Sequence, residues 1–152
     1  MSNDTIIGEK IDQFEAALAE YPEVKCSLIH SFVTGFYIRT IFMPAGTMIT
    51  SKIHKTLHPF RVSKGKVNVM IGEEIQRIEA PHWGMTQPNT RRILYILEDC
   101  VWTTFHATDK TTPEEVEDEI IEKHDNPLLS DEIKRKNHLN ICHSSQLQLV
   151  LE

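Results

Sequence analysis

Two histidines of the 152-residue chain, His54 and His58, are separated by three residues. Side chains four positions apart lie on one face of a helix, and also on one face of a strand, whose side-chain period is two. The flanking residues are rich in β-formers and Pro59 follows directly, so an extended segment is expected rather than a helix. Two imidazoles on one face form half of a transition-metal site. Two partly exposed histidines without a metal would fit the same spacing.

Basic side chains occur on both sides of this pair. Those in or beside the expected strands are Arg39, Lys52, Lys55, Arg61, Arg91 and Arg92. A guanidinium fork matches carboxylate and phosphate groups, so we predict a small anionic ligand, bound by Arg39, Lys52 and Arg91. Arg92 ranks behind these three. The alternative for each is a place on a solvated strand face.

Acid–base chemistry would need a further side chain beside such a site. Tyr37 and Glu98 are the candidate catalytic residues, and His30 is another group of this kind. A phenol or a carboxyl group near a metal can move protons. Taken alone, each of these residues is more often structural.

The composition is that of an ordinary globular domain, with 40% hydrophobic and 25% charged residues. A formal net charge of −6 argues against binding of DNA or RNA. Three dispersed cysteines give neither a disulfide framework nor a zinc knuckle. The polar N-terminus has no signal-peptide pattern and no apolar run reaches membrane-spanning length, so we expect a cytoplasmic protein that does not enter a membrane.

Short β-rich runs bounded by Gly and Pro occupy the middle of the chain, between two helical parts. A first helix is predicted over 8–20. A second begins at Thr112-Pro113 and ends at Asn126-Pro127, and a shorter one begins at Ser130. The predicted strands are Ser27–Phe32, Phe36–Phe42, Thr47–Ile53, Phe60–Val62, Lys66–Ile71, Glu74–Ile78, Arg91–Leu97 and Val101–His106, and the tail from Gln146 is either a strand or a frayed end.

Many short strands of this kind indicate a closed double sheet of the jelly-roll type. We therefore predict a mainly β protein of three parts: an N-terminal helical extension over 1–25, a β-barrel over 26–110 and a C-terminal helical extension over 111–152. The acidic stretch 113–123 of that extension is either a solvated face or an arm that embraces a partner subunit.

The series Pro44, Gly46, His54, His58 and Gly65 resembles the first conserved motif of the cupin superfamily, which carries two histidines and a glutamate between two glycines. In this alignment Lys52 takes the place of the first histidine, and His58 falls at or beside the glutamate. The resemblance implies a single double-stranded β-helix, the RmlC-like cupin jelly roll. It also implies pairing of barrels into a homodimer or a higher homo-oligomer.

The second cupin motif has a proline–glycine turn and one histidine. Here Pro88-Asn89 takes the turn, with Asn suited to a positive φ, and the next candidate histidine is His106. The resemblance thus implies a site of His54, His58 and His106, whose three neutral imidazoles suit a divalent transition metal such as Fe, Zn, Mn or Ni, and also Cu.

Residues 26 to 110 also resemble a narrower group, small uncharacterised cupin-like proteins common in bacteriophage genomes, which would place the chain in a host cytoplasm. The matching residues include Gly35-Phe36-Tyr37-Ile38-Arg39, Ser51-Lys52-Ile53-His54-Lys55, Thr90-Arg91-Arg92 and Val101-Trp102-Thr103-Thr104. The leading hypothesis is a metal-binding cupin, an enzyme or not, that binds or acts on a small anionic molecule. The alternatives are a metal-free module that captures a nucleotide or sugar ligand, a metal-free sugar-nucleotide epimerase or isomerase, and a virion assembly protein.

Overall fold

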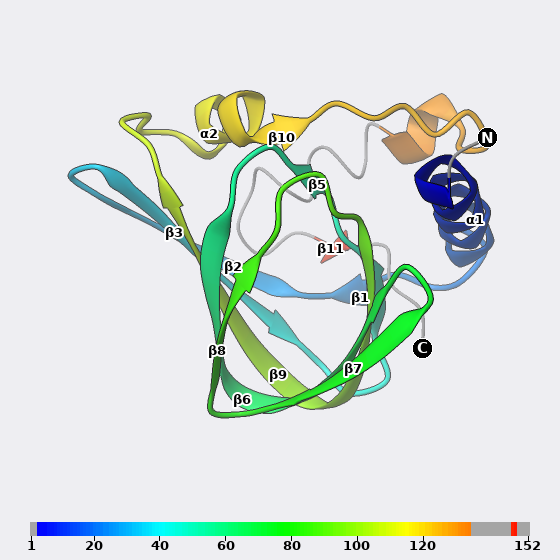
Figure 1. Cartoon of the computed structure of the whole chain (residues 1–152), viewed down its shortest axis with the longest axis horizontal. Coiled ribbons are helices and arrows are strands. Elements are labelled where there is room, and N and C mark those ends of the chain that lie inside the picture. The colour runs from blue at the N-terminus through cyan, green and yellow to red at the C-terminus, as the bar shows by residue number, and fades with distance from the viewer. Residues whose placement is uncertain (1–2, 135–146, 149–152) are drawn as a thin grey trace.

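A computed structural model describes residues 3–134 and 147–148, and shows a β-barrel with helices outside it (Figure 1). The helices are α1 (Asn3–Leu18) and α2 (Pro113–Ile120). The strands are β1 (Val24–Lys25), β2 (Ser27–Val33), β3 (Phe36–Met43), β4 (Met48–Thr50), β5 (Ile53–His54), β6 (His58–Ile71), β7 (Glu74–Glu79), β8 (His82–Thr86), β9 (Arg92–Ala107), β10 (Ile121–Glu122) and β11 (Leu147–Gln148).

The two longest strands, β6 and β9, pair with each other in antiparallel fashion and pass through both halves of the barrel. The start of β6 and the end of β9 lie in one half, which also contains β8, β3 and β2. Their other ends lie in the second half with β7 and β4. A mainly β, antiparallel jelly roll with helices toward both chain ends confirms the predicted fold class.

Both long strands bend where the register between them shifts, around residues 62–67 of β6. Gly65 sits at this bend with φ 98°, and a Cβ there would lie 2.8 Å from the carbonyl oxygen of Glu98. Beyond the bend, inward-facing residues from the two halves meet in one apolar core. Val62, Val67 and Ile96, all fully buried, belong to this core.

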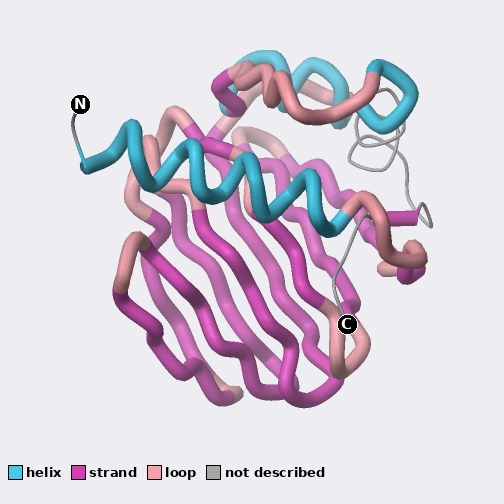
Figure 2. The backbone as a smooth tube through the Cα atoms, turned by 90° about the vertical axis from the view of Figure 1, so that its right-hand side faces the viewer, coloured by secondary structure: helices cyan, strands magenta, loops and turns pink. Residues whose placement is uncertain are grey.

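The helix α1 runs along one side of the barrel, and α2 lies above one end of it (Figure 2). Arg91 ties α1 to the barrel, because its guanidinium lies 2.5 Å from a carboxylate oxygen of Asp12 and 3.0 Å from one of Glu15. Thr112 caps α2 as predicted, and its side chain accepts a hydrogen bond from the backbone of Glu115.

Several element boundaries differ from the prediction. The runs predicted on either side of Gly65 form the single strand β6, because a bulge interrupts its alternation without ending it. The strand β8 was not predicted. The helix α2 ends at Ile120, where the chain turns into β10 and pairs with β5. A short helical turn covers 131–134, and the rest of that predicted helix and most of the tail lie outside the described residues.

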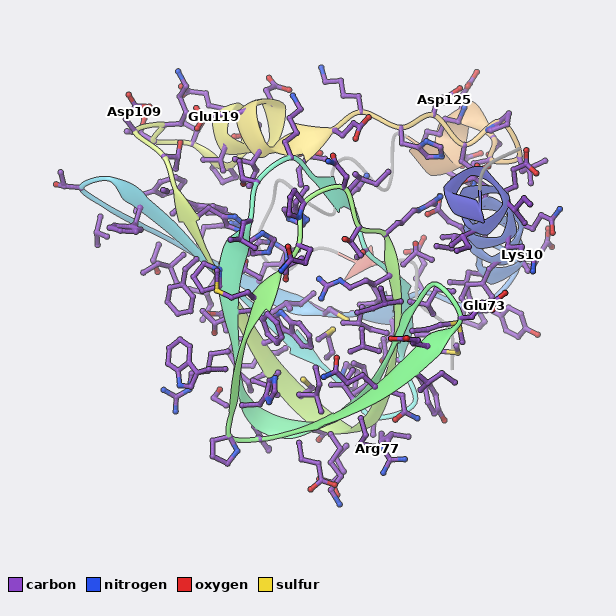
Figure 3. The ribbon with its side chains drawn as sticks, in the orientation of Figure 1. Lys10, Glu73, Arg77, Asp109, Glu119 and Asp125 are labelled. Carbon is purple, nitrogen blue, oxygen red and sulfur yellow. The ribbon has the colours of Figure 1, made fainter. Side chains whose placement is uncertain are left out.

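The six labelled charged side chains, Lys10, Glu73, Arg77, Asp109, Glu119 and Asp125, lie at the periphery of the molecule (Figure 3). In the described part of the chain, none of the helices has the length and apolarity needed to cross a membrane.

Candidate metal centre

Three separate elements bring the predicted histidines to one end of the barrel. His54 is the last residue of β5, and its backbone pairs with Ile121 of β10. His58 is the first residue of β6, opposite Thr86 of β8. His106 lies near the end of β9, opposite Tyr37 of β3.

The three imidazoles form a compact cluster. The ring centroids of His54 and His58 are 4.4 Å apart, those of His58 and His106 are 4.4 Å apart, and those of His54 and His106 are 5.5 Å apart. One nitrogen from each ring lies within 4.8 Å of the corresponding nitrogens of the other two. His58 and His106 are buried, with 2% and 3% of their surface exposed.

One buried nitrogen of each ring has no hydrogen-bond partner among the described residues: Nδ1 of His54, Nε2 of His58 and Nδ1 of His106. The opposite nitrogens of two rings are held, since His58 Nδ1 lies 3.2 Å from the carbonyl oxygen of Thr56 and His106 Nε2 lies 3.0 Å from the hydroxyl of Thr104. A hydrogen bond from Nδ1–H to that carbonyl leaves the lone pair of His58 Nε2 free. The cluster therefore fits a transition metal, with second nitrogens held as in known metal sites.

The site keeps its imidazoles neutral, which is the form that binds a metal. Burial lowers the pKa of His54 to about 3, with further lowering by the charges of His58, Arg92 and Arg39. Burial also lowers the pKa of His106 to about 2, helped by the other two histidines and Arg39. The pKa of His58 is lowered, first by burial and then by Arg92.

A cavity of about 150 Å³ lies beside the cluster. Its walls come from the inner faces of β3 and β9, the segment from Ile49 to His54, and α2 with the start of β10. Most of the lining side chains are apolar, and the charged ones are Arg39, Lys52, Arg92 and Glu117. The cavity thus joins a histidine cluster to a wall with three cations and one anion.

Besides His54 and His106, three of the predicted functional residues line this cavity. Tyr37 is buried, its ring stacks on that of His106 at 5.9 Å, and its hydroxyl hydrogen-bonds Nδ1 of His30. Arg39 and Lys52 are also in the wall. The turn at Pro88-Asn89 has the conformation predicted for it, with φ 61° at Asn89.

The structure does not bring Arg91 or Glu98 to the cavity. The side chain of Arg91 points to α1, where Asp12 and Glu15 bind it. Glu98 lies at the barrel bend, 57% exposed, and its carboxylate is 3.4 Å from Lys66. In place of Arg91 the neighbouring Arg92 lines the cavity. The signal for this was strand alternation, since Arg92 shares its parity with Leu94, Ile96, Trp102 and His106, all buried on β9.

Comparison with solved structures identifies this architecture as cupin-like. A cupin-2 domain protein from Rhodospirillum rubrum matches with a TM-score of 0.51 at 12% identity, over 60% of this chain and 66% of that one. A cupin superfamily protein from Desulfitobacterium hafniense gives 0.49 at 9% identity, over 62% and 87% of the two chains. A cupin-2 domain protein from Shewanella frigidimarina gives 0.48 at 9% identity, over 62% and 92%.

At these identities the likeness concerns the fold alone. No protein-family model matches the sequence, and no curated protein matches it either. The chain is therefore a cupin-like barrel with three histidines placed close enough together to bind one metal ion.

Proposed function

We propose that the protein is a metal-binding cupin whose barrel holds a divalent transition metal through His54 Nδ1, His58 Nε2 and His106 Nδ1, and that this centre binds or acts on a small anionic molecule. Two features of one cluster carry the proposal: each ring offers a nitrogen within 4.8 Å of a nitrogen of the other two, and each ring has one buried nitrogen without a hydrogen-bond partner among the described residues. An unpaired buried polar atom is costly, and one ion would satisfy all three.

A metal held by three imidazoles acts as a Lewis acid and leaves coordination positions open for a ligand or water. The side chains of the cavity would bind the anion and transfer protons. Arg39 and Lys52 provide positive charge for the anion, and Tyr37 places a phenol, already hydrogen-bonded to His30, against the ring of His106. Tyr37 is the residue that we propose as a proton donor or acceptor.

The alternative is a metal-free module in which the cations of the wall capture a nucleotide or sugar ligand, or a metal-free isomerase acting on such a ligand. The basic residues of the cavity would suit the phosphate of a nucleotide as well as any other anion, so they do not distinguish this alternative from the metal-binding proposal. The size of the cavity does not, because about 150 Å³ is the size of a cavity that holds benzene and is too small for a nucleotide.

We also propose self-association through the outer face of the half-barrel β2–β3–β9–β6–β8. Six exposed apolar residues lie there: Ile29, Val33, Phe36, Phe42, Trp83 and Met85. Among the outward-facing residues that pair across these strands, Arg61 stacks on Trp83 and none is acidic. Two copies of this acidic chain can therefore meet at this face without repulsion between carboxylates. The resemblance to bacteriophage proteins and the cytoplasmic location stay predictions.

The metal proposal is tested by elemental analysis of freshly purified protein, made without chelators, beside His54→Ala and a control. We expect about one transition-metal ion per chain in the wild type and a much lower metal content in His54→Ala. Two ligands hold a metal far less tightly than three, so the affinity should fall at least tenfold. The matched control is His82→Ala, another histidine of the barrel that lies outside the cluster.

Well-folded wild-type protein that takes up no Fe, Zn, Mn, Ni or Cu, even when each is added, would contradict the proposal. Equal metal content in His54→Ala and wild type would show that the metal lies elsewhere. Turnover that survives complete chelation would favour the metal-free alternative.

A further inference from the structure

Arg92 is a buried cation without a counter-ion. Only 7% of the residue is exposed, and its Nε is buried without a hydrogen-bond partner. Among the described residues, Arg92 takes part in no ion pair. Its side chain lies over an aromatic ring, with the guanidinium carbon 5.7 Å from the centre of Trp102.

A buried, unpaired guanidinium in this position destabilises the folded state. Removing a charge from water without a partner destabilises a folded protein, and a contact with an aromatic ring offsets only part of that cost. The neighbouring Arg91 shows the usual solution, with two carboxylates within 3.0 Å. Arg92 instead lines the cavity beside the histidines, where a ligand can supply the missing anion.

The remaining wall residues indicate the chemistry of the part of the ligand that lies away from its anionic group. Ile41, Leu94 and Trp102 belong to a mostly apolar lining, which continues above with Val116 and Ile120 of α2. A phosphate group needs donors for three or four oxygens, whereas a carboxylate is satisfied by one guanidinium fork. Arg92 offers such a fork beside Ile41, Leu94 and Trp102, so this part of the wall fits a carboxylate on a short hydrocarbon tail.

We infer that Arg92 anchors the carboxylate of a small organic acid, with a tail of a few carbons packed against Trp102 and the aliphatic wall, beside the three-histidine cluster. This inference rests on the anionic ligand of the proposed function and names its class. It does not need the metal, because Arg92 and the apolar wall belong to the chain itself.

The test is a calorimetric titration of chelator-treated protein with straight-chain carboxylates from acetate to octanoate, their uncharged amides, and inorganic phosphate. We expect affinity to rise about fourfold for each added methylene, the gain from burying one CH₂ group. The rise should stop near six heavy atoms, when a cavity of about 150 Å³ is full. The amides should bind at least tenfold more weakly.

Arg92→Met gives a second readout that a purely structural arginine would not give. Methionine keeps an apolar stem against Trp102 and removes the unpaired charge. We expect carboxylate affinity to fall at least tenfold while the melting temperature of the ligand-free protein stays equal or rises by a few degrees. The control, Arg77→Gln, alters an arginine at the surface that hydrogen-bonds Asn68 and should change neither value.

A lower melting temperature in Arg92→Met with unchanged carboxylate affinity would overturn the inference and make Arg92 a packing residue. Binding of phosphate but not of carboxylates would overturn it too, and would leave the anionic ligand of the proposed function in place. Binding of neither anion would overturn both this inference and the anionic ligand of the proposed function. The metal analysis with His54→Ala tests the histidine site separately.

Discussion

At the scale of single residues, the histidine cluster is built to stay uncharged. Burial holds the pKa of His54 and His106 far below the usual value of 6.5, and each ring would repel the others if it gained a proton. Arg92 and Arg39 add positive charge from the cavity wall. The same features that suit a metal therefore make the ligand-free site sensitive to acid.

We expect the metal-free protein to lose stability as the pH falls below about 6.5. In the unfolded chain each histidine takes up a proton near pH 6.5, whereas in the folded chain His54 and His106 do so only near pH 3 and 2. Between these values the unfolded state binds more protons, so each histidine lowers the free energy of unfolding by up to about 1.4 kcal/mol per pH unit.

Urea denaturation at several pH values, with chelator present, measures this slope. His106→Gln removes one titrating ring, and we expect a shallower slope between pH 6.5 and 4.5 than in the wild type. Parallel slopes in the two proteins would show that the buried histidines are not the cause of the acid sensitivity.

At the scale of elements, the site depends on two long strands that pass through both halves of the barrel. The bend in β6 at Gly65 turns one half of each strand against the other, so that Arg92 and Trp102 meet although both lie on β9. Two short strands, β5 and β10, then pair across the end of the barrel and hold His54 in place.

We expect Gly65→Ala to destabilise the protein by roughly 3 kcal/mol or more, and to disturb the histidine cluster with it. The residue has a positive φ of 98°, and a Cβ would collide with the backbone of β9, 2.8 Å from the Cα of Cys100. Gly35→Ala is the matched control. Its φ is 84° but a Cβ there meets nothing within 4 Å, so only the backbone strain remains, about 1–2 kcal/mol.

Chemical denaturation of the two variants measures the difference. Metal binding by each variant shows whether the bend also positions the histidines. Equal losses of stability in Gly65→Ala and Gly35→Ala would mean that the close approach of β6 and β9 contributes nothing beyond φ.

At the scale of the whole molecule, the barrel has two different outer surfaces. The six exposed apolar residues of the β2–β3–β9–β6–β8 face leave about 600 Å² in solvent, if whole aromatic side chains carry 150–250 Å². Monomers rarely expose more than this in one patch, and a stable interface needs about 800 Å² from each partner. The partly buried residues between them, such as Ile38 and Phe105, supply the remainder.

We expect the protein to be a dimer at micromolar concentration and Met85→Lys to shift it toward the monomer, because a lysine would be buried against the apolar face of the second copy. Ile75→Lys is the control. Ile75 is more exposed, at 65% against 51%, but lies on β7 in the other half of the barrel. Sedimentation or light scattering of all three proteins distinguishes the outcomes. A monomeric wild type at high concentration would contradict the proposed interface.

The sequence by itself determined the class of fold and most of the candidate site. Alternating apolar residues and the Gly and Pro positions are local signals, so the strands, the cap of α2 at Thr112 and the turn at Asn89 followed from short stretches. His54 and His58 were recognisable for the same reason, because four residues keep them on one face.

Only the tertiary structure decided which distant residues meet. His106 joins the other histidines because β9 pairs with β3 and β6 over its whole length, and Glu98 leaves the site because it falls at the bend. The choice between Arg91 and Arg92 depended on strand phase: a shift of one residue exchanges the inside of a barrel for the outside. That phase directs the side chain of Arg91 toward α1, where Asp12 and Glu15 neutralise it. Arg92 then faces the cavity beside the histidines, without an ion pair among the described residues.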